Sequence, residues 1–218
     1  MATWGAHIRI AEVILNQDSS LDEEYFLVGN VGPDCGEPNE DWSEFFPPKS
    51  VSHWISEENF IEAEKFYEKY LNKKIYDNKL YSFLLGYYVH LLTDIQWSNM
   101  IDEKKKTDKE YKKLETDKKF IWTIKKDWYD LDHLYFRKNL NSIFHRIFKN
   151  IEYFPDYLDY YPNGAIERQL KYISGFYTKY NGNPEREYIY LTEKEMNDFV
   201  SKESNYIIEL LKEKENRK

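Results

Sequence analysis

The sequence predicts an all-α fold, with residues 1–218 forming a single multi-helix domain, and two observations predict it. First, helix-interrupting residues are unevenly placed: from Lys49 to Phe154 there is no proline and only one glycine, Gly86. Second, the apolar/polar alternation typical of strands never extends beyond about four or five residues. A long proline-free stretch favours helices over strands joined by tight turns, and no internal repeat or linker divides the chain.

Apolar spacing and capping residues place the first three helices. One is predicted over about residues 6–16, and an irregular segment rich in proline and glycine follows over about residues 28–52. Ser56 is a plausible N-cap for a helix ending near residue 72, and Asp77 for a longer helix ending near residue 99. Residues 102–119 hold eight lysines and six acidic residues, which predicts a polar helix or a loop in solvent.

The second half of the chain contains three further predicted helices. Two of them cover about residues 132–150 and 166–180, where apolar residues recur at helical spacing. The last helix opens with a capping box formed by Thr192 and Glu195, carries apolar residues as far as Leu211, and is expected to fray over residues 212–218.

Composition limits the classes of partner. The net charge of −8 argues against double-stranded nucleic acid and against an anionic bilayer, since both need a basic surface. The single cysteine, Cys35, excludes an intramolecular disulfide, and no apolar run is long enough to span a membrane. With no secretory signal in view, a cytoplasmic protein is expected. Aromatic residues are 18% of the chain, so we expect buried tyrosine hydroxyls that need partners; nothing indicates the oligomeric state.

Residues 86–97, which read GYYVHLLTDIQW, contain the most informative pair of side chains. His90 and Asp94 are four apart, so on a helix they lie one above the other and can share a divalent ion such as Zn²⁺. Gly86 leaves a gap for a loop or ligand one turn earlier, and Trp97 adds an aromatic wall about one turn later. The alternative is a buried hydrogen bond between the imidazole and the carboxylate.

Three further polar residues precede this pair. His7 lies at the start of the first helix, Asp34 follows the turn formed by residues 29–33, and His53 lies just ahead of a helix. Each has an ordinary alternative role, namely a surface residue, a turn residue bonded to its own backbone and a helix-entry residue, respectively.

Taken together, four segments resemble the bacterial zinc-dependent phospholipase C family, to which the fungal single-strand nucleases are more distantly related. The segments are AHIRIAE at residues 6–12, GNVGPD at 29–34, SHW at 52–54 and GYYVHLLTD at 86–94. The resemblance implies an all-helical protein with zinc ions in a cleft. It also implies that one ion is surrounded by Asp34, His53, His90 and Asp94. A second ion would be reached by His7 and by Asp94, which would bridge the two.

The resemblance further implies a zinc-dependent hydrolase of small phosphate esters, foremost phosphodiesters, with Asp34 and Asp94 as catalytic residues and metal-bound hydroxide as the nucleophile. Charge supports this, because three neutral imidazoles, two carboxylates and two Zn²⁺ ions leave the centre positive inside an acidic protein. Water bound to zinc can have a pKa of about 7, which supplies hydroxide near neutral pH.

The chain also departs from this family. The relatives use an N-terminal tryptophan amino group as a ligand, whereas Trp4 is internal and is predicted to pack. They hold a third zinc by two histidines and a glutamate; here Asp130 and His133 are the candidate substitutes, or else begin a solvated helix. Cys35 is a further candidate thiolate, and Trp97 is expected to line the substrate cleft. One to two zinc ions are therefore expected, with a third left open.

Other functions stay open at this point. A nucleotidase or nuclease would use the same chemistry on a different phosphate ester. A structural metalloprotein would use the metal only to hold the His7, Asp34 and His53 segments to the long helix. An aromatic-rich bundle without metal, used for protein binding, is the remaining alternative.

Overall fold

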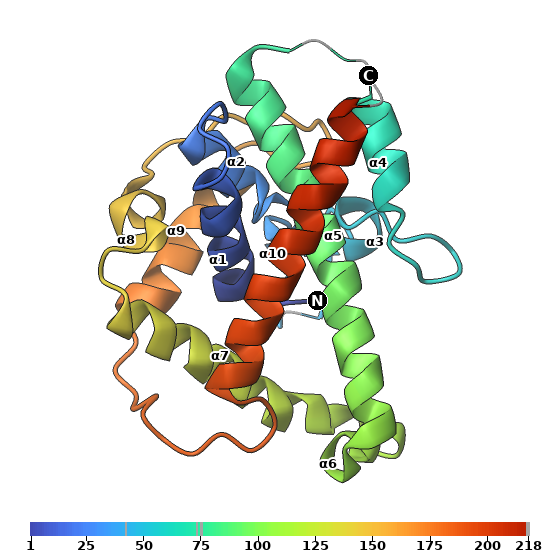
Figure 1. The fold of residues 1–218 in the computed structure, drawn as a ribbon, viewed down its shortest axis with the longest axis vertical. Helices are drawn as coiled ribbons and strands as arrows, with labels where there is room; N and C mark the ends of the chain where they lie inside the picture. The colour runs from blue at the N-terminus through green and yellow to red at the C-terminus, as the bar shows by residue number, and fades with distance from the viewer. Residues whose placement is uncertain (42, 73, 75, 217–218) are drawn as a thin grey trace.

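The computed structural model describes residues 1–41, 43–72, 74 and 76–216, and it confirms the all-α prediction (Figure 1). Its longest helix, α5 (Asn78–Thr107), runs beside α10 (Glu193–Asn216), and α10 also packs on α1 (Trp4–Leu15). Buried apolar side chains from Ala2 to Ile207 form one cluster. Every helix in the described residues is too short or too polar to cross a bilayer.

Shorter elements complete the fold around these three helices. The α-helices are α2 (Glu23–Gly29), α3 (Lys49–Ser52), α4 (Ala63–Tyr70), α6 (Lys109–Lys112), α7 (Ile121–Lys138), α8 (Ile143–Arg146) and α9 (Ala165–Thr178). The 3₁₀ turns are η1 (Gly32–Asp34), η2 (Lys113–Glu115), η3 (Lys118–Phe120) and η4 (Phe148–Asn150). Two short strands, β1 (Glu37–Pro38) and β2 (Phe45–Phe46), pair antiparallel.

The capping signals in the sequence locate several helix starts correctly. The Asp77 carboxylate accepts the backbone N–H groups of Lys79 and Leu80 and so begins α5 where expected. Thr192 and Glu195 exchange the hydrogen bonds of a capping box at the start of α10. The predicted helices over about residues 6–16 and 166–180 correspond to α1 and α9.

Other helix predictions are wrong in their bounds. Ser56 does not cap a helix; it closes a turn in which its N–H bonds the carbonyl of Phe60, and α4 begins only at Ala63. The helix predicted over 132–150 is divided, because α7 begins at Ile121 and ends at Lys138, and Asn139 leaves helical geometry with φ −119° and ψ 68°. The last helix continues to Asn216 instead of fraying from residue 212.

Residues 102–119 are helical at first, within α5 and α6, and then form 3₁₀ turns, as a polar helix or loop was expected to do. The helix α2 was not predicted. Residues 217 and 218, at the end of the segment expected to fray, lie outside the described residues.

Two glycines allow α2 and α5 to touch through their backbones. A Cβ atom at Gly86 would lie 2.1 Å from the carbonyl oxygen of Phe26, and one at Gly29 would lie 2.0 Å from that of Phe83. The gap expected at Gly86 is therefore filled by α2 itself. This close approach places the backbone at the end of α2 beside His90, which matters for the site described below.

Gly86→Ala should consequently destabilise the protein. The added methyl group must push two backbones apart, which typically costs about 1–3 kcal/mol of unfolding free energy. Gly175→Ala is the matched control, because a Cβ there meets only the end of the Lys179 side chain, at 3.9 Å, and should stabilise α9 by about 0.5–1 kcal/mol. Urea denaturation of both variants checks this; equal effects would contradict the packing described.

Candidate metal centre

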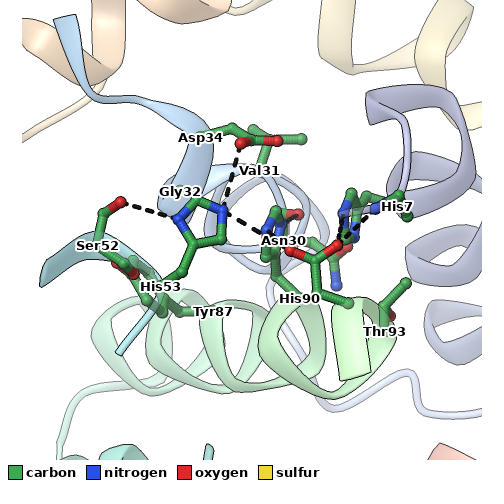
Figure 2. A network of polar contacts seen from close by, with 12 residues as sticks. His7, Asn30, Val31, Gly32, Asp34, Ser52, His53, Tyr87, His90 and Thr93 are labelled. Atoms are coloured by element: carbon green, nitrogen blue, oxygen red, sulfur yellow. Dashed lines mark hydrogen bonds and ion pairs between the residues drawn. The ribbon is translucent and has the colours of Figure 1, made fainter. Parts of the chain in front are cut away.

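The middle of α5 carries His90 and Asp94 into the interior, where both side chains are fully buried. Three other segments converge on them: α1 brings His7, the η1 turn brings Asp34 and the residue after α3 is His53 (Figure 2). The structure thus brings together all five residues that the sequence singled out as metal ligands.

The ligand atoms form two overlapping groups, each with all its atoms within 4.8 Å of one another. One group contains His7, His90 and Asp94, and the other contains Asp34, His53 and His90. Asp94 faces both, because its Oδ1 lies 3.5 Å from His7 Nε2 while its Oδ2 lies 3.4 Å from His90 Nε2 and 3.7 Å from His53 Nε2. His53 Nε2 also lies 3.4 Å from Asp34 Oδ1.

Several atoms that face this centre are buried without a hydrogen-bond partner among the described residues. They are Nε2 of His7, His53 and His90, together with Oδ2 of Asp94. Buried polar atoms are almost always satisfied, so an inward-facing set of this kind indicates a missing partner. Imidazole nitrogens and carboxylate oxygens are donors that Zn²⁺ accepts, so the residues present fit a zinc ion.

The outer ring nitrogens of two histidines are held by hydrogen bonds that turn the inner nitrogens toward the centre. His90 Nδ1 lies 2.9 Å from the carbonyl oxygen of Asn30; a carbonyl can only accept, so Nδ1 carries a proton and Nε2 is the ring nitrogen that faces the centre. His53 Nδ1 lies 3.0 Å from Ser52 Oγ. Such outer partners orient metal-binding histidines and fix their tautomer.

Tyrosine hydroxyls fix the segments that carry His53 and Asp34. The Tyr87 hydroxyl of α5 donates to the carbonyl of Ser52, and the Tyr161 hydroxyl donates to the carbonyl of Gly32 at 2.7 Å. The two hydroxyls are themselves 3.1 Å apart. The expectation that buried tyrosines would have polar partners is confirmed here, and these partners hold the loops that carry the candidate ligands.

The imidazole of His7 is neutral near pH 7. Burial, together with the neighbouring His90, lowers the pKa of His7 to about 4 despite the nearby Asp94 carboxylate. The rings of His7 and His90 stack with their centroids 3.7 Å apart and their planes within 5°, which two imidazolium cations would not favour. His7 therefore has a free nitrogen lone pair, as metal binding requires.

Both carboxylates remain ionised in this interior. Burial alone would raise the pKa of Asp34, but its 3.4 Å contact with His53 Nε2 and the charge of His90 outweigh burial and hold that pKa below its usual value. Burial of Asp94 is likewise outweighed, by the positive chain terminus and by His90, so its pKa lies well below the ordinary range. The backbone N–H of Ala2 donates to Asp94 Oδ1 at 2.6 Å.

A buried carboxyl outside the centre anchors the start of α1, and so the position of His7. Asp132 on α7 accepts hydrogen bonds from the Thr3 hydroxyl at 2.9 Å, the Gly5 N–H at 3.3 Å and the Tyr177 hydroxyl at 2.9 Å. Gly5 is required there, since a Cβ would lie 2.3 Å from the Asp132 carboxyl carbon. Figure 1 shows α7 crossing beneath this end of α1.

The ionisation of Asp132 should make the stability of the folded protein depend on pH. Burial raises its pKa from 3.8 to about 7, so the folded state holds a proton that the unfolded state loses. This contribution to stability is full below about pH 4 and is lost as the pH rises to about 7. Asn does not titrate, so Asp132→Asn should gain stability relative to the wild type over that range. Thermal unfolding in a pH series checks this, and a pH-independent difference would contradict it.

Asp130 and His133 do not join the centre. Neither belongs to a group of candidate ligand atoms among the described residues. Both are buried within α7 and not at a solvated helix start. Asp130 Oδ2 lies 2.7 Å from Arg186 Nη2, and its Oδ1 accepts from the Tyr180 hydroxyl at 2.9 Å. The His133 ring stacks on Tyr180 with centroids 3.6 Å apart. These residues fix the loop after α9 instead.

Two further expectations about the cleft are corrected. Trp97 is buried, packed edge-on against Trp128 and Phe199, and therefore lies in the core. Cys35 directs its thiol to the carbonyl of Val31, and burial raises the pKa of that thiol well above its usual value, so it is not a thiolate ligand. Trp4 packs edge-on against Tyr172 and Phe176, as expected of a packing residue.

Comparison with known proteins agrees with this geometry. The family model for zinc-dependent phospholipase C matches residues 6–152, which contain all five candidate ligands, most of α1 and the helices α2 to α8. No match is found among curated proteins or among solved structures. Because the match covers more than half of the chain, it shows the family. The chain belongs to the zinc-dependent phospholipase C family.

Proposed function

We propose that the protein is a zinc-dependent hydrolase of small phosphate esters, with phosphodiesters as its first substrate class. The observation that carries this is the convergence on one centre of four buried ligand atoms, from three imidazoles and Asp94, that have no hydrogen-bond partner among the described residues. Family membership supports the metal and the phosphoesterase chemistry. We also propose that residues 1–218 form one domain, which the continuous cluster of buried apolar side chains supports.

The two overlapping groups support a site for one to two ions. Asp34, His53, His90 and Asp94 would hold one zinc ion, and His7 would hold a second together with Asp94, whose two oxygens face different histidines. When bound, zinc would supply a Lewis acid that polarises the phosphoryl group and makes water more acidic.

Asp34 is the residue best placed to act on water and substrate. Its side chain is 11% exposed, whereas those of His7, His53, His90 and Asp94 are 0% exposed, so the centre meets solvent on the Asp34 side. Because its pKa is lowered, Asp34 is ionised at neutral pH and can accept a hydrogen bond from an attacking water molecule. We propose that it orients this water and accepts its proton.

The direct test is zinc content per chain together with turnover of bis(p-nitrophenyl) phosphate, before and after treatment with a chelator. We expect one to two zinc ions per chain and turnover that disappears with the metal and returns when zinc is restored. The full burial of four ligands favours a purely structural metal as the second candidate. Bound zinc without turnover of any phosphate ester, nucleotides included, would support that role and contradict the hydrolase.

A further inference from the structure

Tyr87 is fully buried and contacts two of the segments that converge on the centre. Its hydroxyl donates to the carbonyl of Ser52, the residue before His53. Its ring lies against the η1 turn, since a Cβ atom at Gly32 would be 2.9 Å from Tyr87 Cδ2. Phe66 of α4 stacks on the same ring, with centroids 4.7 Å apart and an interplanar angle of 7°. Packing thus fixes the ring and directs its hydroxyl at the backbone beside a candidate ligand.

Tyr161 reaches the η1 turn from a part of the chain that follows the range matched by the family model. Its hydroxyl donates at 2.7 Å to the carbonyl of Gly32, two residues before Asp34. The helix after it, α9, is joined to β1 by an ion pair between Arg168 and Glu37. A segment outside the matched range therefore holds the Asp34 side of the centre.

A count of hydroxyl protons separates the strong contacts of these tyrosines from the weak one. A carbonyl can only accept, so the protons of Tyr87 and Tyr161 are both bonded to the backbone. Tyr160 donates its own proton to the Tyr87 hydroxyl at 3.0 Å. The 3.1 Å contact between Tyr87 and Tyr161 must share a proton already bonded to a carbonyl, which weakens it. Each of these two tyrosines should therefore act mainly on the segment whose carbonyl it bonds.

We propose that Tyr87 and Tyr161 are positioning residues for zinc binding, each holding through one backbone carbonyl the segment that carries His53 or Asp34. This inference rests on the proposed function and adds to it two residues that act on the ligands through the backbone. The spacing that they maintain is that of Asp34 Oδ1 and His53 Nε2, which lie 3.4 Å apart on separate segments.

The other half of the centre is positioned by different contacts. His7 lies on α1, whose start is bonded to Asp132 of α7. Loss of a tyrosine hydroxyl should therefore weaken the ion held with Asp34 and His53 more than the ion held with His7.

The experiment measures the Kd for zinc of the full chain, by competition with a chromogenic chelator, for the wild type, Tyr161→Phe and Tyr87→Phe. Phenylalanine keeps the ring and removes only the hydroxyl. Each variant should bind zinc about 3- to 10-fold more weakly, the effect expected from the loss of one hydrogen bond. The same weakening should persist when each change is combined with His7→Ala, which leaves the group of Asp34, His53 and His90 complete.

Loading the protein with Co²⁺ instead of zinc adds a readout that general destabilisation would leave unchanged. The visible absorption of bound Co²⁺ depends on its coordination geometry, so the spectrum should shift in Tyr161→Phe. The matched control is Tyr111→Phe, which removes a hydroxyl from another buried tyrosine, bonded to the carbonyl of Tyr190 at 2.9 Å. The control should keep the zinc Kd and the cobalt spectrum of the wild type.

Turnover of bis(p-nitrophenyl) phosphate is measured on the same samples, so that two failures can be told apart. A wild type that binds zinc but hydrolyses no phosphate ester contradicts the proposed function, while the zinc Kd values still decide the role of the tyrosines. A wild type that does both, with an equal zinc Kd and cobalt spectrum in both tyrosine variants, overturns only the positioning role. Equal weakening of zinc binding in Tyr111→Phe would also overturn it, because the effect would then be general destabilisation.

Discussion

Asp94→Asn is expected to lower phosphodiester turnover and zinc affinity by at least about 100-fold each. Loss of an outer partner of a metal ligand already costs about 10- to 100-fold, and Asp94 is itself a candidate ligand whose two oxygens face all three buried imidazoles. Asparagine keeps the shape of the aspartate side chain. It removes the negative charge that would offset the charge of a zinc ion bound among the three imidazoles. Elemental analysis after dialysis against dilute zinc, together with turnover of bis(p-nitrophenyl) phosphate, measures both effects.

The control for this variant is Asp102→Asn. It makes the same substitution on the same helix, at a side chain that is 60% exposed and forms a surface ion pair with Lys105. It should leave zinc content and turnover at wild-type values, because exposed ion pairs contribute little. Unchanged zinc binding and turnover in Asp94→Asn would contradict the assignment of the centre.

Removing zinc should also lower the thermal stability of the protein by several degrees in Tm. A ligand that binds only the folded state adds about 2.7 kcal/mol at a concentration 100 times its Kd. For a chain of this length that corresponds to a rise in Tm of roughly 5–10 °C. The physical reason is that zinc satisfies buried nitrogen and oxygen atoms that otherwise have no partner among the described residues. Differential scanning calorimetry with added zinc, and then with a chelator, measures the shift.

The variant His7→Ala tests the two groups of candidate ligands separately, by the same calorimetric measurement of the zinc-dependent shift in Tm. It removes a ligand from the His7, His90 and Asp94 group and leaves the group of Asp34, His53 and His90 complete. A smaller but measurable zinc-dependent shift in Tm is expected. Two results would contradict this account of the centre: a wild type whose Tm does not respond to zinc, or a His7→Ala shift as large as that of the wild type.

Local signals in the sequence predicted what depends on neighbouring residues. Asp77 and the Thr192–Glu195 capping box mark the starts of α5 and α10 because each cap bonds backbone groups only two or three residues away. The four-residue spacing of His90 and Asp94 placed both on one face of α5 for the same reason. Bringing these two together with His7, Asp34 and His53 required the resemblance of four segments to a known family.

What the sequence did not predict depends on contacts between distant segments. Asp130 is bonded to Arg186, which lies 56 residues later, so its role in the loop after α9 could not be read from its spacing with His133. Asn30 orients His90 through a backbone carbonyl, for which residue type carries no signal.

The most direct test of the metal centre is an anomalous difference map from crystals of the zinc-grown protein, collected on either side of the zinc absorption edge. We predict a peak about 2.0–2.2 Å from both Nε2 of His90 and a carboxylate oxygen of Asp94. His53 and Asp34 should complete its coordination, and a second peak should lie beside His7. A map with no anomalous peak among these side chains, or with zinc bound only elsewhere on the protein, would contradict the account.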